Sequence, residues 1–387
     1  MRYEELLHRC FRCGWCKLPT NFIEINCPSY LKFRFESYSP GGRLWLVRAW
    51  RNGDIEAGER LEEIVFSCAT CKNCVEACGI PEIKNYLVDM IIGAREEMVN
   101  AGKLPRSIRN YLTEINMRGN PFQKLQSERS DWAEGLEVPL YNGHEYLFYV
   151  GDVGSFDESA IPMTRAVASM LKDSGISFGI LGENEKSDGN DVQALGEQEL
   201  ARHLAKSNIE QFKKSGIRRI ITLSPHAFNV MKNAYPTLGG AFEIYHYTQI
   251  LHSIIKHTKP EGSFDARVTY HDPCYLGRWN GLYREPRAVL QSIAGLRLVE
   301  MNRNMNNALC CGGGGGNYFT DMLGSGRDSS ARHRVREARE QGADVIAVAC
   351  PICKKMLEDA LKDEDMDSEV RVMDVAQIVL EARRTVA

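Results

Sequence analysis

The sequence predicts a protein of mixed class, with a helical N-terminal domain followed by two tandem α/β repeats. Two observations predict this fold. The thirteen cysteines gather in two groups before residue 80 and in three short pieces after residue 270. From residue 146 onward, strand-like and helix-like segments alternate. A chain of 387 residues is long enough for two or three domains. The expected divisions are a helical domain at 1–104, a connector at 105–145, and repeats at 146–263 and 264–387.

Composition excludes several classes of function. Hydrophobic residues make up 43% of the chain, charged residues 26%, and the net charge is −3, which is ordinary for a globular protein and gives no basis for nucleic-acid binding. The first residues, Met1–Glu5, lack an apolar signal core, and no run approaches the 18 apolar residues of a membrane span. Clustered CxxC pairs in such a chain indicate metal ligands in a reducing compartment. We therefore expect a cytoplasmic protein, from an organism that lives without oxygen.

Eight cysteines of the N-terminal domain fall into two groups with regular spacing. This spacing is similar to that of bacterial two-cluster ferredoxins, in which the fourth cysteine of each group ligates the other cluster. The resemblance implies two cubane [4Fe–4S] clusters, and two zinc sites are the alternative. The first cluster would be held by Cys10, Cys13, Cys16 and Cys78, which we call the outer group. The second would be held by Cys27, Cys68, Cys71 and Cys74, which we call the inner group.

The segments around these cysteines predict helices rather than the short strands of a small ferredoxin. Residues 3–9 and Leu44–Trp50 are helix-like, the second bounded by Gly41-Gly42 and Gly53. Residues 82–99 carry an apolar stripe at helical spacing. The module is therefore expected to be mainly helical. Residues 105–145 are interpreted as a connector along the surface of the next domain, anchored by Trp132.

The region after residue 146 predicts parallel sheets, because strands and helices alternate there. Strands are expected at Tyr146–Val150, Ile176–Ile180, Ile217–Leu223, Arg267–His271 and Val345–Ala349. Helices are expected at Ala160–Lys172, Gln198–Ser215, Pro286–Ile293, Ala331–Gln341, Ile352–Leu361 and Val375–Arg383.

An internal repeat relates the two halves of this region. Gly216 precedes Ser224-Pro225 by eight positions, as Gly342 precedes Cys350-Pro351, and the pair Gln-Ile recurs downstream at 249 and 377. Such self-similarity predicts two copies of one supersecondary unit. We call residues 146–263 the first repeat and residues 264–387 the second repeat.

Only the second repeat carries thiols. They are Cys274, Cys310, Cys311, Cys350 and Cys353, the five-cysteine site. Thiolates select iron–sulfur clusters, zinc or copper(I), and five exceed the four ligands of a tetrahedral zinc site or an ordinary cubane. An extended iron–sulfur cluster fits this count better, and zinc stays the alternative.

The first repeat has lost these ligands. The equivalent positions hold Asp152, Ser187, Asp188, Ser224 and Ala227. Because alanine has no ligand atom and serine is a poor iron–sulfur ligand, the first repeat is interpreted as a retained fold with a lost site. The alternative is a hard metal bound by Asp152, Asp188 and His226.

The single cysteine, the Cys-Cys-Gly and the final CxxC resemble the CCG cysteine-rich domain of heterodisulfide reductase. The whole chain resembles the D-type polypeptide of that enzyme. It also resembles the C-type polypeptide of anaerobic glycerol-3-phosphate dehydrogenase and iron–sulfur components of lactate-utilisation systems and benzoyl-CoA reductase complexes. The resemblance implies one noncubane [4Fe–4S] cluster at the five-cysteine site. In heterodisulfide reductase two such clusters face each other, whereas this chain keeps one, so disulfide cleavage is not expected.

Residues beside the five-cysteine site are expected to tune it. Gly312 and Gly313 let the backbone approach the cluster and donate N–H groups to sulfur, and His271 is assigned to cofactor binding. Arg278 and Arg284 are expected to be solvated at the surface. His226 and His246 are expected to pack or form hydrogen bonds.

Together these features predict an electron-transfer subunit of an anaerobic redox complex. The expected partners are flavin- or iron–sulfur-containing subunits, with a tungsten or molybdenum enzyme and peripheral membrane association left open. The alternative is a catalytic disulfide or quinone reductase, and a third hypothesis is a zinc-binding module without redox activity. No catalytic residue is assigned.

Overall fold

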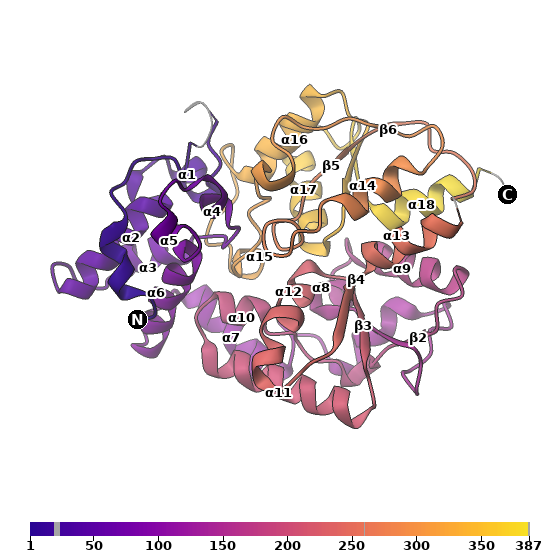
Figure 1. Ribbon diagram of the computed structural model, residues 1–387, viewed down its shortest axis with the longest axis horizontal. Coiled ribbons are helices and arrows are strands. Elements are labelled where there is room, and N and C mark those ends of the chain that lie inside the picture. The colour runs from indigo at the N-terminus through magenta and orange to yellow at the C-terminus, as the bar shows by residue number, and fades with distance from the viewer. Residues whose placement is uncertain (19–23, 259, 386–387) are drawn as a thin grey trace.

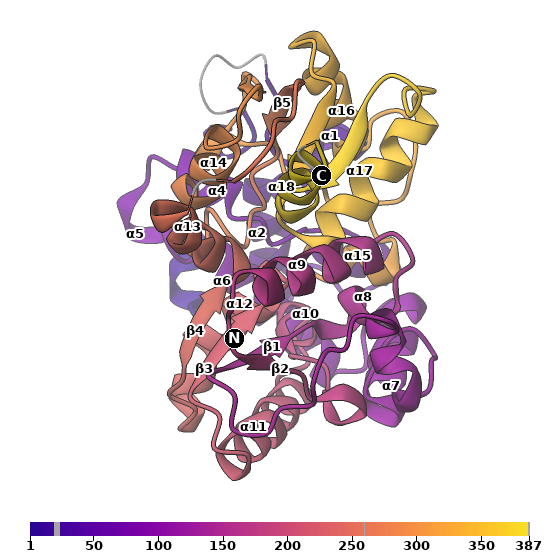
Figure 2. The same ribbon diagram turned by 90° about the vertical axis from the view of Figure 1, so that its right-hand side faces the viewer.

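The computed structural model describes residues 1–18, 24–258 and 260–385. Figure 1 shows the N-terminal domain at one end of the molecule, with the second repeat above the first beside it. The view in Figure 2 shows the sheets of the two repeats lying one above the other, with helices between them. The expected fold class is confirmed.

The N-terminal domain is helical. Its apolar stripe from α6 packs against α2 and α3 around Leu44, Val65 and Met90, all fully buried. The elements are η1 Glu4–Arg9, α1 Pro28–Phe33, η2 Glu36–Tyr38, α2 Pro40–Asn52, α3 Glu59–Phe66, α4 Asn73–Ala77, α5 Pro81–Lys84 and α6 Leu87–Asn100.

Two helix boundaries in this domain differ from expectation. Gly41 and Gly42 lie inside α2, which begins at Pro40 with the Ser39 hydroxyl accepting a hydrogen bond from the Gly42 amide. A Cβ at Gly42 would stand 1.9 Å from the carbonyl oxygen of Glu36, so this glycine serves close packing and not helix termination. The expected helix at 82–99 is divided into α5 and α6.

The connector contains a helix that was not expected. Helix α7 (Arg106–Arg118) buries Ile108, Leu112 and Ile115 at helical spacing, and the 3₁₀ helix η3 (Gln126–Ala133) follows it. Trp132 is 2% exposed and meets the Phe148 ring edge-on with centroids 6.2 Å apart, so it anchors this segment as expected.

Each repeat contains one four-stranded parallel sheet. The strand order is β2-β1-β3-β4 in the first and β6-β5-β7-β8 in the second. The strands are β1 Tyr146–Tyr149, β2 Phe178–Gly179, β3 Arg219–Thr222, β4 Glu243–His246, β5 Arg267–Tyr270, β6 Arg297–Leu298, β7 Val345–Val348 and β8 Arg371–Asp374. The strands β4, β6 and β8 were not expected; each is an edge strand of two to four residues.

Helices cover the sheets and join the repeats, with α9 against α18 and α13 against α14. The first repeat has α8 Gly151–Phe156, α9 Ile161–Asp173, η4 Gly182–Asn184, α10 Asn190–Ala194, α11 Gln198–Lys214, α12 Pro225–Asn233, η5 Tyr235–Leu238 and α13 Tyr247–His257. The second has α14 Arg284–Gln291, η6 Met305–Asn307, α15 Asn317–Thr320, α16 Ser330–Glu340, α17 Pro351–Asp363 and α18 Val375–Arg383.

The internal repeat is confirmed by its local chemistry. Gly216 and Gly342 both adopt left-handed φ values, 70° and 64°, just before β3 and β7. Ser224 and Cys350 are the N-caps of α12 and α17, and a proline follows each. The recurring Gln-Ile pair is explained as well, because each glutamine closes a capping box at the start of α13 or α18.

Strand register sets the equivalence of the ligand positions. Leu147 pairs with Ile220 in the first sheet. Thr269 pairs with Ile346, the equivalent of Ile220, in the second sheet. This register places Asp152 at the position of Cys274, as the sequence match predicts. The carboxyl ends of the central strands, where parallel sheets bind ligands, therefore carry the candidate sites.

Candidate metal centres

The five-cysteine site is a buried cluster of thiols. Its five members are between 1% and 6% exposed, and they come from the loop after β5, the Cys-Cys-Gly turn, and the N-cap and first turn of α17 after β7. The sulfurs of Cys311 and Cys353 are 3.5 Å apart, and those of Cys310 and Cys274 are 3.9 Å apart. These separations are too long for disulfides. The fold therefore brings together all five thiols that the sequence selected.

One residue beside these thiols, and one of the thiols themselves, fit a bound cluster. His271 is 1% exposed, and neither of its ring nitrogens makes a well-formed hydrogen bond within the described residues, while its ring lies within 4.8 Å of the Cys311 and Cys353 sulfurs. Burial lowers the pKa of His271, so the neutral ring keeps one donor and one acceptor. Hydrogen bonding with Cys310 and Cys353 lowers the pKa of the Cys311 thiol, as a metal ligand requires. An orphaned imidazole among converging thiols is what a site that receives a metal cluster presents.

The glycine run after Cys311 has two structural roles. The Gly312 amide lies 3.3 Å from the Cys310 sulfur and donates to it, with φ at 95°. A Cβ at Gly313 would stand 2.5 Å from the Ile352 side chain. A Cβ at Gly314 would stand 2.7 Å from the Ala69 carbonyl oxygen of the N-terminal domain, and a Cβ at Gly315 would stand 2.7 Å from the Cys68 carbonyl oxygen. The expected amide donation is thus present at Gly312, and the next glycines allow contact between domains.

The eight cysteines of the N-terminal domain separate into two neighbourhoods. Burial raises the pKa of Cys10, and nearby Cys13 and Cys78 add to the effect. Burial also raises the pKa of Cys74, to which Cys68, Cys71, Cys16 and Cys27 add. Cys78 therefore lies with the outer group and Cys27 with the inner group, and Cys16 borders both. This grouping is the one that a ferredoxin-type exchange of fourth ligands predicts.

The inner group lies against the five-cysteine site. Hydrogen bonding with Cys310 is the largest cause that raises the pKa of the Cys71 thiol. Arg278, which was expected at the surface, is instead 8% exposed and donates to the carbonyl oxygens of Cys71 at 2.6 Å and Ala308 at 2.7 Å. That expectation was wrong because the N-terminal domain covers this arginine. Arg284 is exposed, as expected.

Three further side chains reinforce this contact, and the sequence pattern did not identify them. The Trp279 indole donates to the Thr70 carbonyl at 2.9 Å, and the Tyr275 and Thr70 hydroxyls are 2.7 Å apart. Arg95 is fully buried and donates to the Cys68 carbonyl at 2.6 Å and to the Gly315 carbonyl of the second repeat at 3.5 Å. No periodicity or spacing signal marks such residues, because each acts on a segment more than 25 positions away.

The equivalent site of the first repeat is filled by polar side chains. Four of its five positions, all but Ala227, line a cavity of about 30 Å³. Asp152 forms an ion pair with buried Arg129 at 2.5 Å, and His226 meets Asp191 at 3.0 Å. These pairings occupy two of the three groups that a hard metal would need, and the described residues bring no Asp152, Asp188 and His226 triad together. The geometry therefore disfavours the hard-metal alternative.

The titratable groups of that cavity have shifted pKa values. Burial raises the pKa of Asp188 to about 7, and the neighbouring Asp152 and Asp191 add to the effect. Burial alone would lower the pKa of His226, but the Asp191 carboxylate raises it to about 9. His246 is fully buried and hydrogen-bonded to Thr248 and the Leu223 carbonyl, so the expectation of a hydrogen-bonding role is confirmed.

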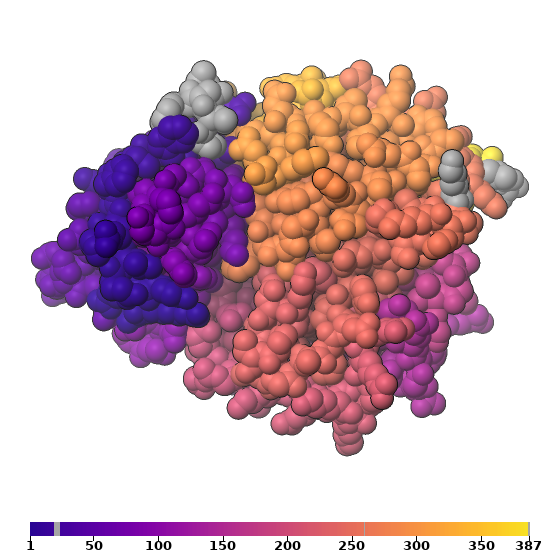
Figure 3. Space-filling model, in the orientation of Figure 1, coloured from indigo at the N-terminus to yellow at the C-terminus, as the bar shows by residue number. Residues whose placement is uncertain are grey.

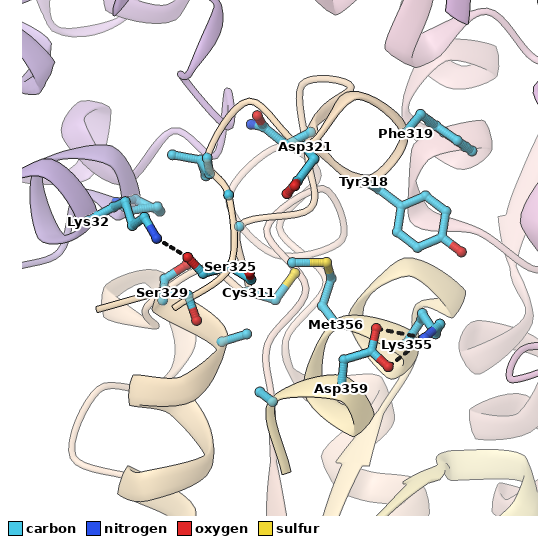
Figure 4. A pocket seen from close by; sticks show the side chains of 18 of the residues that line it. Lys32, Cys311, Tyr318, Phe319, Asp321, Ser325, Ser329, Lys355, Met356 and Asp359 are labelled. Atoms are coloured by element: carbon cyan, nitrogen blue, oxygen red, sulfur yellow. Dashed lines mark hydrogen bonds and ion pairs between the residues drawn. The ribbon is translucent and has the colours of Figure 1, made fainter. Parts of the chain in front are cut away.

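A cavity of about 440 Å³ reaches the five-cysteine site at Cys311 (Figure 4). Tyr318, Phe319 and Met356 line its apolar part, and Figure 4 shows Lys32 of α1 and the Lys355–Asp359 ion pair near its charged rim. Its volume lies within the range of small-molecule sites.

The comparisons with known proteins match the three parts of the chain that contain these residues. The dicluster family described as "4Fe-4S dicluster domain" matches residues 6–80, and the CCG "Cysteine-rich domain" matches residues 154–232 and 268–358. The chain thus matches a 4Fe-4S dicluster domain in the N-terminal domain and a cysteine-rich domain in each of the two repeats.

Three curated relatives each match more than four fifths of this chain. One is the "Probable iron-sulfur-binding oxidoreductase FadF" of Bacillus subtilis, 35% identical over 83% of this chain and 47% of that protein. Another is the "EtfAB:quinone oxidoreductase" of Syntrophomonas wolfei, 30% identical over 97% of this chain and 58% of that protein. A third is the D-type polypeptide of the dihydromethanophenazine:CoB–CoM heterodisulfide reductase of Methanosarcina mazei, 30% identical over 97% of this chain and 94% of that protein. The chain spans about half the length of the first two.

Proposed function

This chain belongs to the family of iron–sulfur oxidoreductases typified by the D-type polypeptide of heterodisulfide reductase, and on that basis we propose that it is the electron-transfer subunit of a larger redox complex. One observation carries the proposal. The inner cysteine group lies directly against the five-cysteine site, with Cys71 beside Cys310 and Arg278 bonded to both segments. Electron transfer between centres needs such short, rigid separations.

Each cysteine group has a proposed cofactor. The outer and inner groups would each hold a cubane [4Fe–4S] cluster, and the five-cysteine site would hold one noncubane [4Fe–4S] cluster. When bound, the clusters supply single-electron transfer. The amides of Thr70 and Gly312 lie 3.4 Å and 3.3 Å from cysteine sulfurs, where they would stabilise the more negative, reduced state.

The arrangement of residues suggests the path of the relay. Cys13 of the outer group is exposed, whereas the five-cysteine site is buried behind the inner group. Electrons would therefore enter or leave at the outer group and pass through the inner group. The proposed partners are flavin- or iron–sulfur-containing subunits in the cytoplasm, with a tungsten or molybdenum enzyme as a further partner. The described residues contain no helix that is both long and apolar enough to cross a membrane.

Anaerobic isolation from the native organism tests the subunit proposal. We expect a flavin-, molybdenum- or tungsten-containing protein to co-purify with this chain. A chain that always runs alone from native extract would contradict the proposal.

A second candidate function is catalytic reduction of a disulfide or quinone. The cavity beside Cys311 favours it, because a substrate there would reach the five-cysteine site from solvent. Reduced viologen as donor and an organic disulfide or quinone as acceptor test this function on the isolated protein. If the protein only transfers electrons within a complex, the isolated chain should reduce little of either acceptor. Robust turnover by the parent would favour the reductase if Met356→Trp, which fills the cavity, abolishes it without changing the iron content.

A further inference from the structure

The surface around the outer cysteine group is basic and aromatic. Cys13 is exposed, and Phe11 beside it is 69% exposed, an unusual exposure for a large apolar ring. Residues 6–18, around Cys10, Cys13 and Cys16, and residues 40–50 contain several arginines and no aspartate or glutamate, whereas Glu76 and Glu82 flank Cys78. Figure 3 shows that this N-terminal domain, in indigo, forms one end of the molecule. The outer group is thus the centre that an external protein can approach most closely.

Two of the arginines are held in place beside a ligand of this group. The guanidinium of Arg12 lies 4.4 Å from the Trp45 ring centroid and that of Arg48 lies 5.4 Å from it. The same indole donates to the Cys10 carbonyl at 2.6 Å. Trp45 therefore fixes both cations next to the outer group by cation–π contact, which restrains side chains that would otherwise be mobile.

No ion pair in the described part of the chain neutralises these cations. Arg9, Arg12 and Arg48 form no ion pair among the described residues, although Arg51 close by is paired with Glu4 and Glu97. Three unpaired guanidinium groups around one redox site create a positive potential that attracts a negatively charged partner. The surface composition, with arginine and aromatic residues at its centre, is also that of protein interfaces.

We propose that this surface, formed by Arg9, Phe11, Arg12, Trp45 and Arg48, docks an acidic protein that carries one electron at a time. The proposal rests on the proposed function and names the class of its partner. On docking, one electron leaves the reduced carrier and enters the outer centre, and no bond is formed or broken. An anionic membrane is a weaker candidate, because it would cover the exposed Cys13 centre with lipid headgroups and leave it without a donor.

Binding is tested with a gallium-substituted plant-type ferredoxin, an acidic carrier that has the same surface but accepts no electron. The dissociation constant is measured by calorimetry from about 20 to 200 mM salt, where screening of surface charges increases. We expect the affinity to fall with salt, and the variant Arg9→Glu/Arg12→Glu/Arg48→Glu to bind about tenfold more weakly or worse at low salt. The corresponding triple lysine variant, which keeps the charge, should bind almost as the parent does.

Arg218→Glu is the matched control, because Arg218 is exposed, forms no ion pair among the described residues and lies in the first repeat. It should leave the affinity unchanged. Affinity that is independent of salt, or equal in the parent and the triple glutamate variant, would overturn the proposal. The proposal would also be overturned if the protein bound phosphatidylserine vesicles in a charge-dependent way and did not bind the ferredoxin.

Reduction by the small viologen radical separates this proposal from the proposed function. Stopped-flow absorbance should show all centres of the parent and the triple glutamate variant reduced by viologen, while native reduced ferredoxin reduces the variant at least about tenfold more slowly. If viologen never reduces the five-cysteine site, the proposed electron relay is wrong, but the proposed docking surface is not contradicted. If viologen reduces every centre but ferredoxin reduces the parent and the triple glutamate variant at the same rate, the proposed docking surface is wrong and the proposed relay is not contradicted.

Discussion

The guanidinium Nε of Arg278 donates a hydrogen bond to the carbonyl oxygen of Cys71 at 2.6 Å, across the boundary between the second repeat and the N-terminal domain. The same side chain holds the Ala308 carbonyl, two residues before Cys310. A single buried arginine therefore fixes the backbone next to a member of the inner group and next to a member of the five-cysteine site. This contact gives the first of five predictions.

Arg278→Met should destabilise the boundary between the domains. It leaves the buried Cys71 carbonyl without this donor, at about 1–3 kcal/mol, and leaves the Ala308 carbonyl with only the longer hydrogen bond from the Asn73 side-chain amide at 3.4 Å. We expect a lower thermal midpoint under anaerobic conditions and slower electron exchange between the inner and five-cysteine centres, measured by rapid-freeze electron paramagnetic resonance. Arg284→Met, at an exposed position, is the control and should leave both properties unchanged. Equal behaviour of the two variants would show that Arg278 does not couple the domains.

Iron content tests the assignment of sites. Two cubanes and one noncubane cluster predict about 12 irons per chain, four for each cluster. A cluster in the first repeat would raise the count to about 16, and zinc at the five-cysteine site would give about eight irons and one zinc. Cys311→Ala should remove the noncubane signal while both cubane signals persist. We expect about 12, because Asp152 in the first repeat is already paired with Arg129.

Cys78→Ala tests the exchange of fourth ligands. Because Cys78 lies near Cys13 and Cys10, its loss should damage the cluster of the outer group and leave the inner cluster intact. Cys27→Ala is the reciprocal variant and should damage the inner cluster. Paramagnetic resonance of the reduced proteins distinguishes the two centres. Loss of the inner signal from the Cys78 variant would reverse the assignment.

His271→Leu tests the role of the orphaned imidazole. If a ring nitrogen donates to the cluster at the five-cysteine site, its removal should lower the midpoint potential of that centre, because hydrogen bonds to sulfur favour the reduced state. Redox titration followed by paramagnetic resonance gives the potential. The two cubane potentials serve as internal references and should stay fixed. An unchanged potential at the five-cysteine centre would assign His271 to packing alone.

Asp188→Asn tests the buried acidic cavity of the first repeat. The pKa of Asp188 is about 7 in the folded protein, above its unfolded value of 3.8, so the folded state binds the proton more tightly. Stability contributed by the protonated acid is therefore present below about pH 4 and is lost as the pH rises to about 7. The variant should be more stable than the parent at about pH 8, by at most about 4 kcal/mol, and gain little at about pH 4.

Thermal midpoints at those two pH values measure this difference. His226 contributes in the same direction over a higher range, because its folded pKa of about 9 lies above its ordinary 6.5. Its contribution is complete below pH 6.5 and is lost as the pH rises through about 9. Equal gains of the Asp188 variant at both pH values would show that folding does not raise the pKa of Asp188.

Local patterns account for much of this protein. Cysteine spacing selected all five thiols that meet in the second repeat, and the match of Gly216 with Gly342 identified two equivalent sheets. The spacing of Ile108, Leu112 and Ile115 also encoded helix α7, although it was interpreted as connector. Ligand spacing, turn glycines and helical periodicity are short-range signals, so one sequence is enough to recognise them.

The way in which the domains meet depends on packing between distant segments. The contact of Arg278 with Cys71, and the approach of Gly314 and Gly315 to the N-terminal carbonyls, join segments more than 200 positions apart. Nothing in the spacing distinguishes buried Arg278 from exposed Arg284, because burial depends on which distant surface covers each side chain. Local spacing therefore specifies the ligands and the repeats, whereas the contact between domains makes the inner group face the five-cysteine site.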